Sequence, residues 1–129
     1  MIQLSLNDLP LVIACAAFSL MGAGALIRPS LVTRQFGMPD LSAAGRSEVR
    51  AVYGGYGLAM AACLIACLFA PVLKPGVCLT LAAALGGMAV GRAVSAVIDR
   101  TLPRLPALYL LLEAGMAGLL LYPVLSVQA

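Results

Sequence analysis

Four long apolar runs constrain this chain more than any other feature. They cover residues 9–27, 49–72, 76–98 and 105–125, and each is close to the roughly 17–25 apolar residues that a helix needs to cross a bilayer. Only helices and closed barrels satisfy their backbone polar groups inside hydrocarbon, and no alternating barrel strands occur here. The sequence therefore predicts an all-α integral membrane protein, a four-helix transmembrane bundle that forms a single domain over residues 1–129.

The cationic residues indicate how these helices are oriented. Lys and Arg are retained on the cytoplasmic side, so the connections that carry them are expected inside the cell. The connections after the first and third runs hold Arg28, Arg34, Arg46, Arg50, Arg100 and Arg104, and the opposite side holds Lys74. We therefore expect a protein of the bacterial inner (plasma) membrane with both termini outside. The net charge of +3 is then an orientation signal, and no nucleic-acid partner is predicted.

The first run is expected to stay in the protein as a helix. A secretory signal peptide begins with a positively charged segment, and no Lys or Arg precedes Arg28.

Two charged residues interrupt the apolar runs at similar depth. At about 1.5 Å per residue, Arg92 lies roughly 9 Å inside the third run and Glu113 roughly 12 Å inside the fourth. A short connection makes these runs antiparallel neighbours. An unpaired charge at that depth costs about 2–3 kcal/mol, so a partner is expected. The sequence therefore predicts an Arg92–Glu113 pair.

Further polar side chains share the faces of these residues. Helical spacing places them on one stripe of each run. The candidates are Glu48, Arg50 and Tyr53 in the second run and its border, Arg92, Ser95 and Asp99 in the third, and Tyr109 and Glu113 in the fourth. Together they predict a polar pocket that opens toward the cytoplasm. Two interpretations stay open: an ion-pair network that fixes helix register, and a site for a ligand or ion.

Small residues and cysteines also recur in the runs. Gly87, Gly91 and Ser95 form one ridge, Gly54, Gly55 and Gly57 a second, and Gly115 and Gly118 a third. Small residues let membrane helices approach closely, so these ridges indicate packing within the protein or a homodimer face. The cysteines are Cys15, Cys63, Cys67 and Cys78. They are interpreted as small apolar residues and not as a redox site, because no C-x-x-C pair occurs.

The absence of histidine from the sequence excludes several chemistries. Ser-His-Asp and Cys-His nucleophile pairs and histidine-based zinc and haem sites all need it. No cofactor, no metal site and no catalytic residue is therefore predicted. Acid–base chemistry through Glu113, Asp99 or a tyrosine stays open.

Three motifs resemble a known family. They are SEVRAVYGGYGLAM, AVGRAVSAVID and YLLLEAGMAGLLL, in that order. They are similar to small bacterial four-helix membrane proteins of the domain-of-unknown-function family numbered 4345. In that family an acid-x-Arg precedes Tyr-Gly-Gly, a Gly-Arg is followed by an Asp, and a Glu lies on the fourth helix. The matching residues are Glu48, Arg50, Tyr53, Gly54, Gly55, Gly91, Arg92, Asp99 and Glu113.

The resemblance covers nearly the whole chain and implies a four-helix fold with the same polar residues, but no established activity. Where the family often continues Asp-Gly, this chain has Asp99-Arg100, which implies a different turn at that point.

Three functions remain as hypotheses. The first is a non-enzymatic binding or accessory module that holds a membrane lipid, a hydrophobic or amphiphilic ligand, or a partner membrane subunit. The second is a small proton- or ion-coupled transporter that acts as a homo-oligomer. The third is a membrane enzyme that acts on lipid head groups. We favour the first, because Arg92 would neutralise the one deep carboxylate that a transporter needs.

Overall fold

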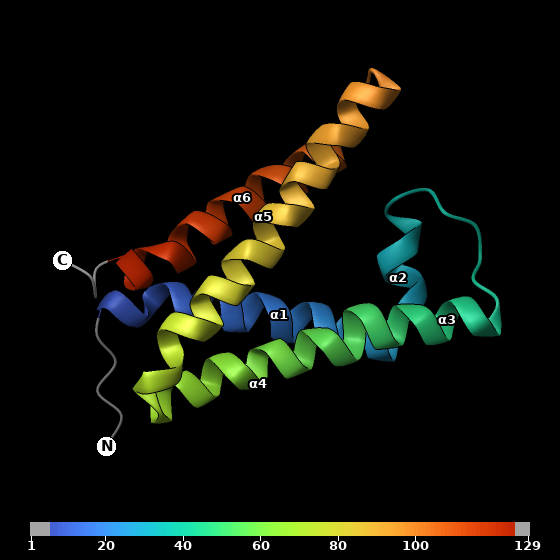
Figure 1. Cartoon of the computed structure of the whole chain (residues 1–129). Helices are drawn as coiled ribbons and strands as arrows, with labels where there is room; N and C mark the ends of the chain where they lie inside the picture. Colours follow the sequence, from blue (N-terminus) through green and yellow to red (C-terminus); the bar gives the residue numbers. More distant parts are fainter. Residues whose placement is uncertain (1–5, 126–129) are drawn as a thin grey trace. The chain divides into compact units, whose positions relative to one another are not determined.

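The computed structural model describes residues 6–125, and every regular element within them is helical. Four helical stretches are long and apolar enough to cross a membrane, so the prediction of four spans in an all-α protein is confirmed. In chain order the elements are η1 (Leu6–Asp8), α1 (Leu9–Ile27), α2 (Pro29–Arg34), α3 (Ala43–Val49), η2 (Arg50–Gly55), α4 (Tyr56–Phe69), η3 (Pro71–Leu73), α5 (Lys74–Asp99) and α6 (Arg104–Leu125) (Figure 1).

The second span differs most from its predicted boundaries of 49–72. Its helix begins at Ala43, because the hydroxyl of Ser42 accepts a hydrogen bond from the backbone N–H of Gly45 at 3.1 Å and caps the helix. The helix continues through the π-helical segment η2 into α4 and ends at Phe69. Hydropathy locates the part of a helix suited to lipid, whereas the capping serine fixes where the helix starts.

The described residues divide into two compact units. Residues 6–11 and 67–125 form the first, which contains α5 and α6, and residues 12–66 form the second, which contains most of α1 together with α2, α3, η2 and most of α4. In the first unit α5 and α6 pack against each other (Figure 1). They are joined by the short segment 100–103.

The turn after α5 has an unusual backbone. Arg100 follows the last residue of the helix and adopts the left-handed conformation, with φ of 51° and ψ of 33°. Glycine adopts this conformation without a steric penalty, whereas other residues pay roughly 1–2 kcal/mol. The arginine in place of the family's glycine implied a different turn at this point. In the structure, however, Arg100 adopts the backbone conformation that a glycine at this position would favour.

We expect Arg100→Gly to stabilise the protein by about 1 kcal/mol, because glycine relieves the left-handed strain but loses more freedom on folding. The measurement is the free energy of unfolding in detergent micelles. Arg100→Ala is the matched control, since it removes the same charge and keeps the strain. A glycine variant that is no more stable than the alanine variant would contradict the interpretation that Arg100 is strained in its left-handed conformation.

Glycines bring the backbones of the second unit close together. A Cβ added at Gly22 of α1 would lie 2.9 Å from the backbone nitrogen of Leu58. One added at Gly57 would lie 3.1 Å from the Cα of Gly22, and one at Gly54 would lie 2.7 Å from Leu26 Cδ2. The prediction that small residues serve packing within the protein is thus confirmed for Gly54 and Gly57.

The other small-residue ridges have no such close neighbour. Outside its own turn of helix, a Cβ added at Gly87, Gly91, Gly115 or Gly118 would meet no atom of the described residues within 4 Å. A homodimer face at these positions stays a prediction.

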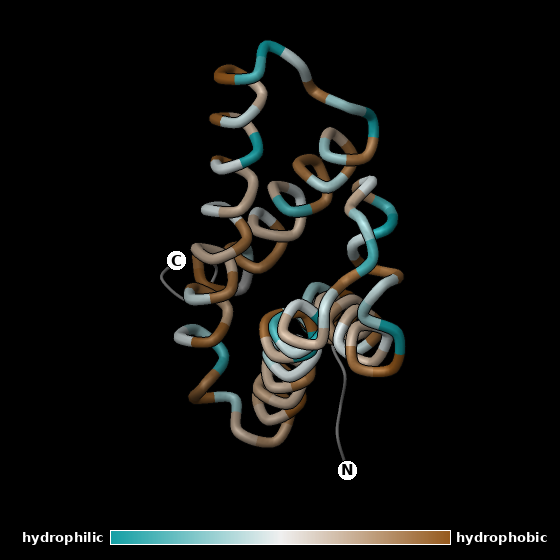
Figure 2. The backbone as a smooth tube through the Cα atoms, turned by 90° about the vertical axis from the view of Figure 1, so that its right-hand side faces the viewer, coloured by the Kyte–Doolittle hydropathy of each residue, from teal (hydrophilic) through white to brown (hydrophobic). Residues whose placement is uncertain are grey.

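Large apolar side chains cover the outside of the helices. On α5 and α6, the exposed ones include Val90, Val94, Val97, Leu111 and Leu112. At most 33% of the most apolar 18-residue window of any span is buried. In Figure 2 most residues along the helices are apolar, and hydrophilic residues occur at the connections and at a few positions within the helices. Leaving such a surface in water costs about 25 cal/mol per Å², so it is suited to hydrocarbon.

Candidate functional site

A salt bridge with two parallel hydrogen bonds joins α5 to α6. Arg92 donates from Nε to Oε2 of Glu113 and from Nη2 to Oε1, both at 2.7 Å. The Glu113 side chain is 7% exposed and that of Arg92 is 24% exposed, so this bidentate pair lies largely away from solvent. The sequence predicts the pair from matched depth, and the structure brings the two groups together. Each charge therefore has its counter-charge within the hairpin that α5 and α6 form.

Tyr109 holds the same guanidinium from a second direction. The residue lies one turn before Glu113 on α6, and the Cζ atom of Arg92 is 5.2 Å from the centre of the tyrosine ring. This is within the range of a cation–π contact, which contributes about 0.5–2 kcal/mol depending on solvation. The structure thus places Tyr109 and Glu113 against Arg92, as their common stripe predicts.

Ser95 and Asp99 form a separate contact one turn nearer the end of α5. The hydroxyl of Ser95 donates a hydrogen bond to Oδ2 of Asp99 at 2.9 Å, and both residues are exposed. Their spacing of four residues places them on one face of the helix. Ser95 and Asp99 therefore lie together, as their common stripe predicts.

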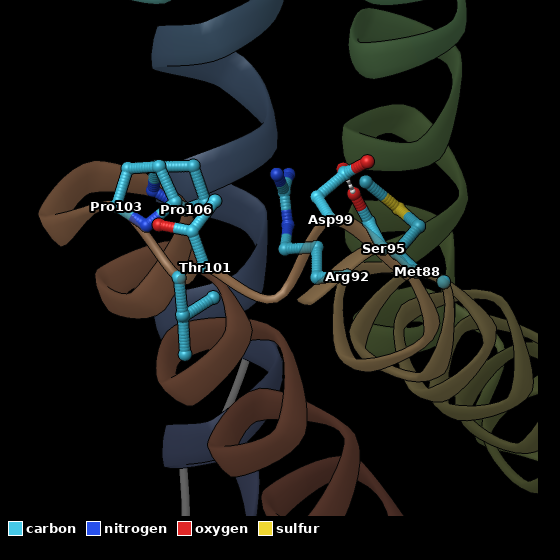
Figure 3. Close-up of a pocket in the computed structure, with 9 residues that line it drawn as sticks. Met88, Arg92, Ser95, Asp99, Thr101, Pro103 and Pro106 are labelled. Carbon is cyan, nitrogen blue, oxygen red and sulfur yellow. Dashed lines mark hydrogen bonds between the residues drawn. The ribbon is translucent and has the colours of Figure 1, made fainter. Parts of the chain in front are cut away.

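Arg92, Ser95 and Asp99 line a hollow of about 390 Å³. Its lining residues are Met88, Gly91, Arg92, Ser95, Asp99, Thr101, Leu102, Pro103 and Pro106. Figure 3 shows Ser95 hydrogen-bonded to Asp99 on the α5 side, with Thr101, Pro103 and Pro106 contributed by the connection and the first turn of α6. The volume is within the range of small-molecule sites. The hollow therefore combines two charged groups and two hydroxyls with an apolar remainder.

The remaining candidates lie in the second unit. Arg50 is exposed at the start of η2, and its Nε donates a hydrogen bond to the backbone carbonyl of Leu26 at 3.1 Å. This carbonyl belongs to the last turn of α1, where helix carbonyls lack intrahelical partners and a cation is favourable. Glu48 and Tyr53 are both exposed. Arg50 therefore has a helix-capping contact of its own.

Two ion pairs within the described residues were not predicted from the sequence: the exposed pair Arg34–Asp40, and a largely buried pair at the start of α5. Lys74, the first residue of α5, donates from Nζ to Oδ1 of Asp8, which is buried just before α1. Successive membrane spans alternate in direction, so the starts of the first and third runs are expected at the same face of the membrane. An acid just before the first run and a base just before the third could therefore have predicted the Asp8–Lys74 pair from the sequence.

The cysteines are free thiols in the structure, and Cys67 and Cys78 are buried. Cys15 contributes a weak hydrogen bond from Sγ to the carbonyl of Ala61 at 3.7 Å. Among residues 6–125, no group of three or more His, Cys, Asp or Glu side chains could hold a metal ion.

Long apolar helices, a largely buried ion pair and a polar hollow at one end of a hairpin define an all-α membrane protein. Residues 8–123 match the family described as "Domain of unknown function (DUF4345)". This match covers most of the chain, so the protein belongs to the family that its motifs resemble. No curated protein and no solved structure matches the chain.

Proposed function

We propose that this protein is a non-enzymatic, membrane-embedded binding module. In this proposal the hollow beside Arg92, Ser95, Asp99 and Thr101 receives the polar head of an amphiphile. The observation that carries it is the position of these polar lining groups at the end of two helices whose outer surfaces are apolar. An amphiphile can then satisfy its head group in the hollow and leave its chains in the surrounding hydrocarbon.

We place the hollow on the cytoplasmic side of the bacterial inner membrane. The connection 100–103 contributes to its lining and is bordered by Arg100 and Arg104. Cationic connections are retained in the cytoplasm, and the connection between the first two spans is also rich in arginine. Both termini are then outside.

The pairing of Glu113 supports a binding module over a proton-coupled transporter. A transporter of that kind must protonate and deprotonate its carboxylate in each cycle. Both oxygens of Glu113 accept hydrogen bonds from Arg92, so protonation would deprive a largely buried guanidinium of its counter-charge. We therefore assign a structural role to the pair and a binding role to the hollow.

The test is native mass spectrometry of the protein extracted in mild detergent. We expect the wild type to retain an amphiphile, and Gly91→Leu to reduce its retention about tenfold. Gly91 lines the hollow with open space where its Cβ would be, so a leucine side chain would occupy volume that the amphiphile needs, and a tenfold loss of binding corresponds to about 1.4 kcal/mol.

Gly87→Leu is the matched control, because Gly87 lies one turn earlier on the same ridge and does not line the hollow. Equal retention by both variants, or a wild-type protein without any bound amphiphile, would refute the proposal. A retained molecule that the protein chemically converts would point instead to an enzyme.

A further inference from the structure

The charges that line the hollow are not equally compensated. Arg92 is engaged by the carboxylate of Glu113 and the ring of Tyr109. Asp99 has a different environment, because the group that donates to it is the neutral hydroxyl of Ser95. The salt bridges found in residues 6–125 are Arg34–Asp40, Lys74–Asp8 and Arg92–Glu113, and Asp99 takes part in none of them. The hollow therefore presents a carboxylate that lacks a cationic partner.

The hollow also holds hydrogen-bond acceptors besides this carboxylate. Ser95 and Thr101 also line the hollow, and each hydroxyl oxygen carries two lone pairs that can accept. An occupant with several N–H donors would satisfy both the acceptors and the negative charge. An anionic occupant would instead meet the uncompensated charge of Asp99.

We infer that the hollow selects a primary ammonium head group, with Asp99 as its counter-ion. This inference rests on the proposed binding function and specifies its ligand class. A primary ammonium carries three N–H donors, which match a carboxylate and two hydroxyls. A quaternary ammonium has no N–H donor and is usually held by aromatic side chains, and none of the described residues that line the hollow is aromatic.

Two arginines that flank the lining segment 101–103 in the sequence favour a zwitterionic phospholipid as the source of this ammonium. Arg100 and Arg104 are exposed at either end of segment 101–103, which lines the hollow. Guanidinium groups bind phosphate through paired hydrogen bonds. An ethanolamine phospholipid places a phosphate two carbons from its ammonium. It can thus present the amine to Asp99 and its phosphate to the two flanking arginines.

The test offers the detergent-solubilised full chain an equimolar mixture of phosphatidylethanolamine and phosphatidylglycerol with the same acyl chains. Native mass spectrometry measures the ratio of the two bound lipids. We expect about a tenfold preference for the ethanolamine lipid, the size of one charge-assisted hydrogen bond. Asp99→Asn is expected to bring the ratio close to one. Asp40→Asn is the control, because Asp40 is an exposed carboxylate outside the hollow, and it should keep the wild-type ratio.

A third lipid, phosphatidylcholine with the same acyl chains, tests the hydrogen bonds. We expect it to bind about as weakly as the glycerol lipid, since its ammonium has no N–H. Thermal unfolding of each variant in the same detergent verifies that the Asp99 substitution leaves the fold intact.

The outcomes separate the two proposals. Binding of all three lipids with equal affinity would overturn the ammonium assignment and leave the proposed function standing. Binding of none of them, together with an empty wild-type protein, would overturn both. A preference that persists in Asp99→Asn would show that another group selects the head, and would overturn the role of Asp99.

Discussion

Arg92→Met is expected to lower the free energy of unfolding by about 3–5 kcal/mol, and Glu113→Leu by a similar amount. The reason is that either substitution leaves one charge largely buried between α5 and α6 with its counter-charge removed. The measurement is denaturant unfolding in detergent micelles, followed by circular dichroism. This is the largest effect that we expect from any single substitution in the chain.

The double variant Arg92→Met with Glu113→Leu should recover much of that loss. Two apolar side chains of similar size replace a buried ion pair with little or no net penalty, so the single effects are strongly non-additive. Arg104→Met, which removes an exposed arginine at the start of α6, is the control and should change stability little. Additive losses in the double variant would show that the two residues act independently. This result would contradict a stabilising role for the Arg92–Glu113 ion pair.

Gly22→Ala is expected to destabilise the protein by about 1–3 kcal/mol. The new Cβ would lie 2.9 Å from both the backbone nitrogen and Cγ of Leu58, and 3.0 Å from the carbonyl oxygen of Gly54. Two of these three atoms belong to the backbone, so a side-chain rotation does not relieve the clash. The unfolding measurement is the same as for the ion pair.

Gly87→Ala provides the matched control for this substitution. Gly87 is also a helical glycine, but beyond its own helical turn a Cβ added there meets no atom within 4 Å in the part of the chain that the structure describes. Alanine in an open helical position is favoured over glycine by about 0.5–1 kcal/mol, so this variant should be neutral or slightly stabilised. A Gly22→Ala protein as stable as Gly87→Ala would contradict the close approach of α1 to the segment 54–58.

The helices could be predicted because hydrocarbon imposes a simple condition on sequence. A span needs about 20 apolar residues, and the first, third and fourth runs were located within two residues of α1, α5 and α6 at either end. The helix of the second span begins six residues before the predicted run, at Ala43. Its first turns are polar and exposed, so hydropathy does not detect them, and the cap at Ser42 is a local hydrogen bond.

The candidate site could be predicted in part for a similar reason. A charge inside a span needs a partner, so Arg92 and Glu113 were paired from depth alone. Asp8 and Lys74 were not paired, because both lie at span ends, where water can solvate a charge and depth gives no reason to expect a partner. Thr101 was also missed, since a lone threonine in a short connection carries no periodic signal.

The sequence by itself determined that this chain forms apolar helices of membrane-spanning length and that its deep charges must meet. Both follow from the free energy of placing polar groups in hydrocarbon, which depends on composition and position along the chain. Only the tertiary structure decided that Arg100 turns through a left-handed conformation, that Gly22 lies against segment 54–58, and that Asp99 lines a hollow without a cationic partner. These depend on the distances between particular atoms, which the order of residues alone does not specify.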